Sequence, residues 1–246
     1  MEKTYTTIEG RNPVYEAIAS DMPVEKIYIS NASKGSQISK IINIAREKGV
    51  PFKAVSPDKI DEIAKTDSNQ GVVAVCSEVS YSSLEDILRV AEEKNEPPFI
   101  IICDEITDPH NLGAIIRTAN AVGAHGVVIP KNRSVGVTPV VFKTSAGAAS
   151  YTKVARVNNL SQAMDRLKEK GVWITGADMA GDKEMCDSDL KGPLAIVVGS
   201  EGRGIMKKVK ENCDFLVRIP MVGEINSLNA SVAAAVLMYE ALRQRR

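Results

Sequence analysis

The stretch LAIVVGSEGRGI, residues 194–205, decides the fold of this 246-residue chain. Five apolar residues predict a buried strand, which runs into Gly199, Gly202 and Gly204. Glycine permits tight turning and close approach of a ligand. The spacing is not that of a P-loop or of a G-x-G-x-x-G dinucleotide loop. A plain strand-to-helix turn is the alternative, but it leaves the carboxylate of Glu201 between the glycines unexplained. We therefore expect a ligand-binding loop at the end of this strand.

A second segment, FLVRIPMVGEINSLNASVAAAVLMYEAL (residues 215–242), also joins a strand end to polar residues. The loop after the strand leads into a helix predicted over residues 228–243. Three polar residues lie at this junction: Asn226, Ser227 and Asn229. Asn226 or Ser227 could serve as the N-cap of the helix. One cap accounts for one polar residue but not for a cluster, so we interpret the cluster as part of a site.

A third segment, DEITDPHNLGAIIRTANAVGAHGVVI (residues 104–129), follows another strong strand. Its loop leads into a helix predicted over residues 112–122. Arg117 lies in this helix among alanines and isoleucines, an environment that is costly unless the guanidinium reaches a partner or an opening. The alternative is an arginine whose apolar stem packs on the surface while its head stays in water.

Strands and helices alternate through the C-terminal part of the chain. This pattern predicts an α/β fold with a mostly parallel sheet and helices on both faces. Ligands of such sheets bind beyond the carboxyl ends of the strands, where all three segments lie. The predicted strands are 99–104, 126–130, 152–157, 172–178, 194–199 and 215–220. The predicted helices are 112–122, 140–149, 160–170 and 228–243.

The N-terminal part has the pattern of a separate, smaller α/β unit. Apolar residues at helical spacing and short β-rich runs alternate there. The helices are predicted at 9–20, 36–48 and 57–65, and the strands at 26–30, 51–55 and 72–76. Residues 79–98 contain a helix predicted over 84–93 that the Pro pair of EKNEPP breaks. We therefore expect an N-terminal domain at 1–78, a linker at 79–98 and a catalytic domain at 99–246.

The composition narrows the class of protein. Thirty-one basic and thirty-one acidic residues cancel, which counts mildly against a nucleic-acid enzyme, although one local basic face can still hold phosphates. Four widely spaced cysteines and two histidines argue against a disulfide framework and a metal centre. The sequence contains neither an apolar run long enough for a membrane span nor an apolar leader. We expect a cytoplasmic protein with no metal and no membrane contact.

The three segments together, in this order, resemble the motifs of the SpoU branch of the SPOUT superfamily of RNA methyltransferases. The KTSAGA segment (residues 143–148) also resembles this family. GRNPVYEAI (10–18) and NQGVVA (69–74) resemble the accessory domain of the branch that methylates 23S rRNA, a domain similar to the L30e and L7Ae-type RNA binders. The resemblance implies a deep C-terminal trefoil knot in the catalytic domain, an L30e-like substrate-binding domain at the N-terminus, and a homodimer.

The resemblance also implies the activity and its residues. The expected reaction is transfer of a methyl group from S-adenosylmethionine to a ribose 2′-hydroxyl, most simply of a guanosine in 23S rRNA. The implied cofactor-binding residues are Gly199, Ile219, Leu228 and Ala177. The implied catalytic residues are Arg117, Asn111, Glu201, Ser227 and Asn229. The family's arginine is often described as a general base. Because guanidinium stays protonated, we interpret Arg117 as an electrostatic anchor for phosphate and alkoxide.

RNA contact is expected from the accessory domain and from a basic rim. The candidates are Arg11, Lys131, Arg133, Lys143, Arg203 and the run Lys207, Lys208 and Lys210. Runs of charged residues usually form solvent-exposed surfaces, so the alternative for each of these residues is a surface position without RNA contact. Three other functions stay open: the same chemistry on tRNA or at an antibiotic-resistance site of rRNA, a non-catalytic RNA-binding or ribosome-assembly protein, and a small nucleotide binder, which would lack its usual lysine or acidic signature.

Overall fold

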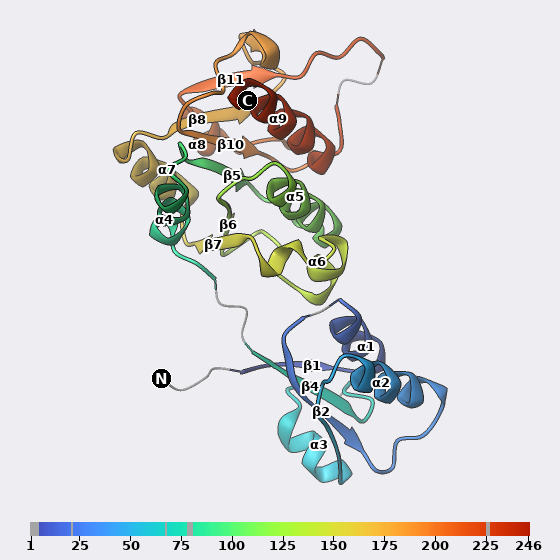
Figure 1. Ribbon diagram of the computed structural model, residues 1–246. Coiled ribbons are helices and arrows are strands. Elements are labelled where there is room, and N and C mark those ends of the chain that lie inside the picture. Colours follow the sequence, from blue (N-terminus) through green and yellow to red (C-terminus); the bar gives the residue numbers. More distant parts are fainter. Residues whose placement is uncertain (1–4, 21, 67, 78–80, 225–226) are drawn as a thin grey trace. The chain divides into compact units, whose positions relative to one another are not determined.

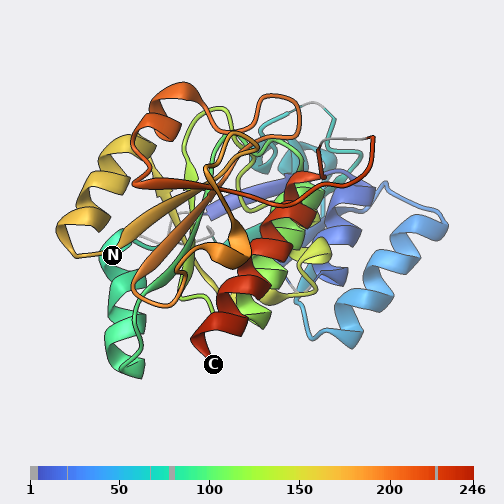
Figure 2. The same ribbon diagram turned by 90° about the horizontal axis from the view of Figure 1, so that it is seen from above.

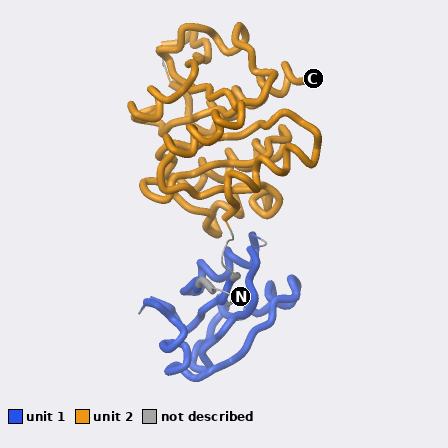
Figure 3. Tube along the Cα trace, turned by 90° about the vertical axis from the view of Figure 1, so that its left-hand side faces the viewer, with its two compact units in different colours: residues 1–80 blue, residues 81–246 orange. Residues whose placement is uncertain are grey.

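A computed structural model describes residues 5–20, 22–66, 68–77, 81–224 and 227–246. The chain divides into two compact units, Met1–Ser80 (unit 1) and Tyr81–Arg246 (unit 2), which Figure 3 colours separately. Among the described helices, none combines the length and apolar character needed to cross a bilayer.

Unit 1 is built on a four-stranded sheet (Figure 1). Its elements are β1 (Tyr5–Glu9), α1 (Arg11–Ala19), β2 (Val24–Ser30), α2 (Ser36–Glu47), β3 (Phe52–Val55), α3 (Pro57–Ile63) and β4 (Val72–Ser77). The strand order is β1-β4-β2-β3, with β4 antiparallel to both neighbours and β3 parallel to β2. Val72, Val73 and Ala74 are buried in succession. Because successive side chains point to opposite faces, both faces of β4 are covered.

Unit 2 contains a seven-stranded sheet. Its elements are α4 (Leu84–Lys94), β5 (Phe99–Cys103), α5 (Pro109–Ala121), β6 (Gly126–Pro130), α6 (Pro139–Thr144), the 3-10 helix η1 (Ala148–Ser150), β7 (Lys153–Val157), α7 (Leu160–Glu169), β8 (Trp173–Ala177), β9 (Lys183–Glu184), the 3-10 helix η2 (Met185–Asp187), β10 (Leu194–Val198), α8 (Lys207–Glu211), β11 (Phe215–Arg218) and α9 (Ala230–Arg245). The strand order is β7-β6-β5-β10-β8-β11-β9, and these neighbours all pair in parallel. The predicted parallel sheet is confirmed.

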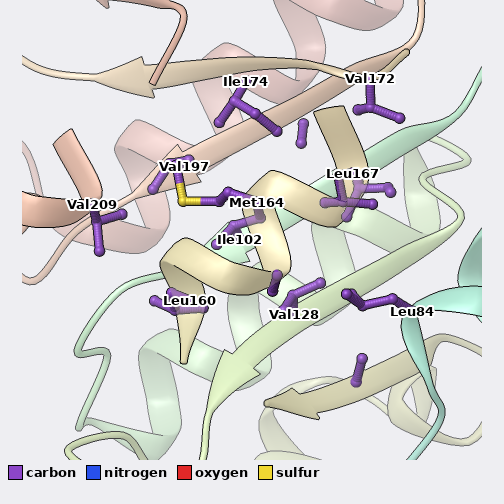
Figure 4. Close-up of a cluster of buried hydrophobic side chains, with 14 of the residues drawn as sticks. Leu84, Ile102, Val128, Leu160, Met164, Leu167, Val172, Ile174, Val197 and Val209 are labelled. Atoms are coloured by element: carbon purple, nitrogen blue, oxygen red, sulfur yellow. The ribbon is translucent and has the colours of Figure 1, made fainter. Parts of the chain in front are cut away.

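Helices cover both faces of this sheet, as the alternation of elements predicts. On one face, Ile102, Val197 and Ile174 pack with Met164 and Leu167 of α7 in a continuous apolar cluster that also includes residues of α4 and α8 (Figure 4). On the other face, α9 packs on β10 and β8, and α5 lies beside it (Figure 2). Burial on both faces explains why the central strands are apolar at every position.

One predicted helix is wrong in part. The helix expected over residues 140–149 is divided into α6 and η1. Thr138 is the N-cap residue of α6, and Pro139 occupies the first turn. Both residue types are favoured at these positions of a helix. Ala146 and Gly147 then adopt positive φ angles of 50° and 81°, which end it. The sequence prediction also missed β1, β9, α8 and η2, of which β9 has two residues and η2 has three.

Helix α4 belongs to unit 2 although the sequence places it in a linker. Ser82 bridges Ala155 of β7, so the chain joins the second sheet before the helix starts. Ser83 and Asp86 form a reciprocal capping box at its N-terminus. Leu84 and Ile87 are buried in the core of unit 2.

The entry of the chain into β5 is held by a buried histidine. The Nδ1 atom of His125 accepts a hydrogen bond from the backbone N–H of Phe99 at 2.9 Å, and its Nε2 lies 3.0 Å from a carboxylate oxygen of Glu96. Since Nδ1 accepts, the neutral ring carries its proton on Nε2. Burial lowers the pKa of His125 below its ordinary value, and Glu96 opposes this only in part.

We expect protonation of this histidine to destabilise the fold. The unfolded ring takes up a proton below about pH 6.5, whereas the folded ring resists it, so the free energy of unfolding falls as the pH drops through that window. His125→Asn keeps a nearby acceptor oxygen but does not titrate, so its free energy of unfolding should vary less with pH. Urea denaturation of both proteins across this range measures the difference. Equal pH slopes would contradict the assignment.

Candidate active site

A cavity of about 380 Å³ lies at the carboxyl ends of β8, β10 and β11. This is the edge at which α/β sheets bind ligands. Three chain segments form its walls, one after each strand, and the start of α9 closes it. The lining residues are Ala177, Asp178, Met179, Val198, Gly199, Ser200, Glu201, Gly202, Arg203, Gly204, Val217, Ile219, Met221, Ser227, Leu228, Ala230 and Ala233.

The wall after β10 is a glycine loop, residues 199–204, that folds back on itself. A Cβ atom added to Gly199 would lie 2.0 Å from the carbonyl carbon of Gly204, a distance that no side chain can tolerate. Ser200 and Gly204 pair as an antiparallel bridge, and Gly204 has a φ of 65°. Glycine is therefore required at 199 for close approach and favoured at 204 for its conformation.

A buried carboxyl group holds the base of the glycine loop. Asp104, directly after β5, accepts a hydrogen bond at 2.7 Å from the backbone N–H of Met206, and its own N–H donates to Val198. Burial raises the pKa of Asp104, and the hydrogen bond from Met206 opposes this in part. The sequence reasoning missed Asp104, because an acidic residue after a strand also fits an ordinary solvated turn.

Three polar side chains from distant segments form a closed network beside the cavity. Asn111 of α5 donates through Nδ2 to Oε1 of Glu201 at 2.9 Å. Asn229 donates through its Nδ2 to the same oxygen and, at 3.0 Å, to Oδ1 of Asn111. Oδ1 of Asn229 accepts from the backbone of Ser231 and Val232 and so caps α9. Because both amides donate to the same oxygen, they fix the carboxylate of Glu201 between the start of α5 and the start of α9.

Two matching protein families and several similar proteins agree on the family of this chain. Residues 98–239, more than half of the chain, match the SpoU rRNA Methylase family. The chain belongs to this family. Residues 7–82 match the substrate-binding domain of RNA 2′-O ribose methyltransferases. A TrmH-family tRNA/rRNA methyltransferase of Bacillus subtilis, YacO, is 45% identical over 245 residues, which cover 100% of this chain and 98% of that protein.

A second relative and a solved structure extend the comparison. A TrmH-family tRNA/rRNA methyltransferase of Staphylococcus haemolyticus is 43% identical over 97% of this chain and 95% of its own length. The crystal structure of the SpoU methyltransferase AviRb from Streptomyces viridochromogenes in complex with AdoMet superimposes with a TM-score of 0.69 at 27% identity, covering 98% of this chain and 90% of that one. The chain is thus an RNA methyltransferase of the TrmH/SpoU family.

The structure brings most of the expected SpoU site residues together. All four expected cofactor residues line the cavity: Gly199, Ile219, Leu228 and Ala177. Among the expected catalytic residues, Glu201 and Ser227 also line it. Asn111 and Asn229 both donate hydrogen bonds to Glu201. These positions are consistent with the expected roles and leave the roles themselves as predictions.

Arg117 does not join this group within one chain. It is exposed on α5 and is absent from the lining of the cavity in the described part of the chain. It follows Asn111 by six residues, which in an α-helix rotates its side chain by about 240° and shifts it by about 9 Å along the axis. A single copy of the chain therefore presents Arg117 to solvent.

The N-cap alternative for the loop before α9 is wrong for Ser227. Asn229 is the N-cap residue, so the helix starts two residues later than expected. Ser227 is exposed and lines the cavity instead. Asn226 lies outside the described residues.

The expected RNA-binding residues lie in both units. In unit 1, Arg11 is half-buried, and its backbone N–H and Nε both donate to Gln70. In unit 2, Lys131, Arg133, Lys143 and Arg203 are exposed. Arg133 and Arg203 both pair with Glu105, a residue that the sequence reasoning did not single out.

A larger cavity of about 540 Å³ lies at the amino ends of the same strands, beside Trp173, Leu194 and Phe215. None of the residues that the resemblance assigns to cofactor binding or catalysis lines it. Volume alone therefore does not identify the site. The cavity at the carboxyl ends of the strands is the candidate, because its lining residues belong to the motifs.

The glycine loop yields a direct test of the cavity. Gly199→Ala should lower the melting temperature by about 5–10 °C, the shift for a loss of roughly 2–3 kcal/mol in a chain of this size. It should also weaken binding of S-adenosylmethionine, measured by titration calorimetry, because the loop must open. Gly192→Ala is the matched control, since a Cβ there meets no atom within 4 Å and Gly192 does not line this cavity. Equal behaviour of the two variants would contradict the close-packing argument.

Proposed function

We propose that this RNA methyltransferase transfers a methyl group from S-adenosylmethionine to a ribose 2′-hydroxyl, in a guanosine of 23S rRNA. The observation that carries the proposal is the Asn111–Glu201–Asn229 network beside a cavity of three strand ends. It supports a reaction in which the fixed carboxylate of Glu201 holds a ribose hydroxyl next to the bound methyl donor. The match of unit 1 to the substrate-binding domain of 2′-O ribose methyltransferases supports ribose as the acceptor.

The residues of the cavity fit the cofactor. Strand-end backbone groups offer hydrogen-bond partners for an adenine, and Ile219, Leu228 and Ala233 offer apolar walls. The absence of a side chain at Gly199 lets the loop turn back over this space. The AviRb structure contains AdoMet, which supports the same cofactor here. When bound, the sulfonium supplies an electrophilic methyl group, so the protein must align the acceptor with it.

The polar network provides that alignment. Glu201 is fixed by two amide donors, and its carboxylate can accept a hydrogen bond from a ribose hydroxyl. Ser227 is exposed at the rim of the same cavity and can donate to the sugar or the neighbouring phosphate. The network restricts the motion of Glu201, which lowers the entropic cost of bringing the hydroxyl into line.

Arg117 enters the site from a second copy of the chain in this proposal. It is exposed and cannot line its own cavity, whereas α9 beside it carries an apolar surface with Val232 47% and Tyr239 53% exposed. Ala235 and Val236 between them are half-buried. Residues at this spacing share one helix face, so α9 can pack against a symmetry-related α9. A homodimer through this face would bring Arg117 of the partner toward the site.

The role of Arg117 follows from its chemistry. A guanidinium is protonated at all working pH values, so it is a poor base. Its planar fork binds a phosphate with two hydrogen bonds, and its charge stabilises a developing alkoxide. We therefore assign it to the phosphate beside the target nucleotide.

The RNA class and the knot are parts of the same proposal. The name of the SpoU rRNA Methylase family supports ribosomal RNA, while the names of the Bacillus and Staphylococcus relatives include tRNA as well, so tRNA is the second candidate substrate. The trefoil knot implied by the SpoU resemblance stays a prediction. The insertion of β10 between β5 and β8 and the closure of the cavity by the segment before α9 are compatible with it.

The substrate can be identified by methyl transfer. Purified protein with radiolabelled S-adenosylmethionine should label 23S rRNA that lacks the modification, and the labelled nucleotide should resist alkaline cleavage, because a 2′-O-methyl group blocks attack on the phosphate. Label in tRNA would select the second candidate. If the label lies on a base, the RNA is still cleaved by alkali at that nucleotide. This result would reject ribose methylation.

Arg117→Lys should lower turnover by about 100-fold or more while leaving S-adenosylmethionine affinity nearly unchanged, since lysine lacks the planar fork. Arg89→Lys, on the exposed face of α4, is the control. Mixing inactive Arg117→Ala and Glu201→Ala proteins should restore part of the activity if the arginine acts across a dimer, because one site of a mixed dimer is intact. Full activity of Arg117→Lys would remove this residue from the reaction.

A further inference from the structure

A nearly buried carboxylate connects two exposed arginines at the edge of the sheet. The side chain of Glu105 is 13% exposed, and its Oε1 accepts a hydrogen bond from Nη1 of Arg133 at 3.3 Å. Its Oε2 lies 4.0 Å from Nη1 of Arg203. The two arginine side chains are 77% and 78% exposed. We call these three residues the arginine clamp.

The clamp lies where a substrate would meet the cofactor cavity. Its members follow three adjacent strands: Glu105 follows β5, Arg133 follows β6, and Arg203 belongs to the glycine loop after β10. Their backbones therefore meet at the carboxyl ends of the strands, the ligand-binding edge. Arg203 also lines the cavity itself, so the clamp adjoins it directly.

The backbone of the clamp is held in an unusual conformation. Glu105 and Arg133 have φ angles of 54° and 58°, which residues with a Cβ atom rarely adopt. The segment after Arg133 is fixed to the segment after Glu105, because Ile106 O accepts hydrogen bonds from Val135 N and Ser134 Oγ, both at 2.9 Å. Such conformations persist only where the surroundings impose them, and they concentrate at functional sites.

The charges of the clamp leave capacity for an anion. One carboxylate offsets one of two guanidiniums, so the cluster keeps a net positive charge. Each guanidinium has five N–H donors, and the side chains of Arg133 and Arg203 are largely exposed. A phosphodiester accepts such donors in pairs, which makes arginine the residue suited to hold it.

We propose that Glu105 is a positioning residue that holds Arg133 and Arg203 as one binding site for a backbone phosphate of the RNA substrate. The inference rests on the proposed function, because it names a substrate contact of the same site. A phosphate of RNA fits better than the carboxylate of S-adenosylmethionine, since only Arg203 lines the cavity and Arg133 does not.

The decisive variants remove the carboxylate without adding strain. Glu105→Gly suits the positive φ angle, so its melting temperature should not fall. Glu105→Gln keeps the size of the side chain and removes the charge. Glu211→Gln is the matched control, because Glu211 is an exposed carboxylate of the same unit that pairs with Lys207. The readouts are affinity for deproteinised 23S rRNA and total tRNA at several salt concentrations, affinity for S-adenosylmethionine alone, and melting temperature.

The sign of the effect separates positioning from simple charge. Removing a negative charge near RNA should tighten binding if only the overall field matters, and Glu211→Gln measures that effect. Positioning predicts the opposite: both Glu105 variants should bind RNA about tenfold more weakly, with the slope of log affinity against log salt smaller by about one. Arg133→Ala should then cost little further affinity in the Glu105→Gly protein, as expected for residues that act as a unit.

Several results would overturn the proposal. Equal or tighter RNA binding by the Glu105 variants at all salt concentrations would reject positioning, provided that the unaltered protein binds and methylates RNA. Weaker S-adenosylmethionine binding by the same variants, with RNA affinity unchanged, would assign the clamp to the cofactor instead. An unaltered protein that binds neither RNA would reject the proposed function and the clamp together.

Discussion

The close contact between two backbone segments, at Gly199 and Gly204, is the constraint on which the site depends. No side chain fits between them, so the glycine at 199 is what allows the chain after β10 to fold back within six residues. That reversal places Glu201 and Arg203 at the edge of the sheet, one toward the amides of Asn111 and Asn229 and the other toward Glu105. Asp104 fixes the end of the reversal at Met206. A change in this one contact would displace Glu201 and Arg203, the two charged residues of the loop.

Much of the fold follows from hydrophobic pattern alone. The uninterrupted apolar runs of β5 and β10 predict strands buried on both faces, and β6 was predicted with its observed bounds, Gly126–Pro130. The cavity residues required more than pattern. Gly199, Ile219 and Leu228 belong to segments separated in sequence, and the resemblance to the SpoU family grouped them before the sheet order did. The hydrophobic pattern predicts where each strand ends. The resemblance to the SpoU family predicts which of these strand ends lie together.

The rest could not be predicted because it depends on angles and contacts that residue types do not encode. Ala146 breaks the helix predicted over 140–149 with a φ of 50°, a conformation for which alanine gives no signal. Helix α5 begins at Pro109 rather than at residue 112, and its direction decides that Asn111 points inward while Arg117 points outward. Asp104 and Glu105 resemble any acidic turn until their partners, 102 and 98 residues away for Met206 and Arg203, are known.

The place of β10 between β5 and β8 also has a consequence for how the protein is made. Ile100 of β5 pairs with Ala195, so the centre of the sheet joins residues almost a hundred positions apart. Until the ribosome has released that segment, β5 has an open edge on one side, with its backbone amides and carbonyls unpaired. Contacts so distant in sequence slow folding and prolong exposure of such edges. The nascent chain therefore carries an aggregation hazard that ends only when its last third emerges.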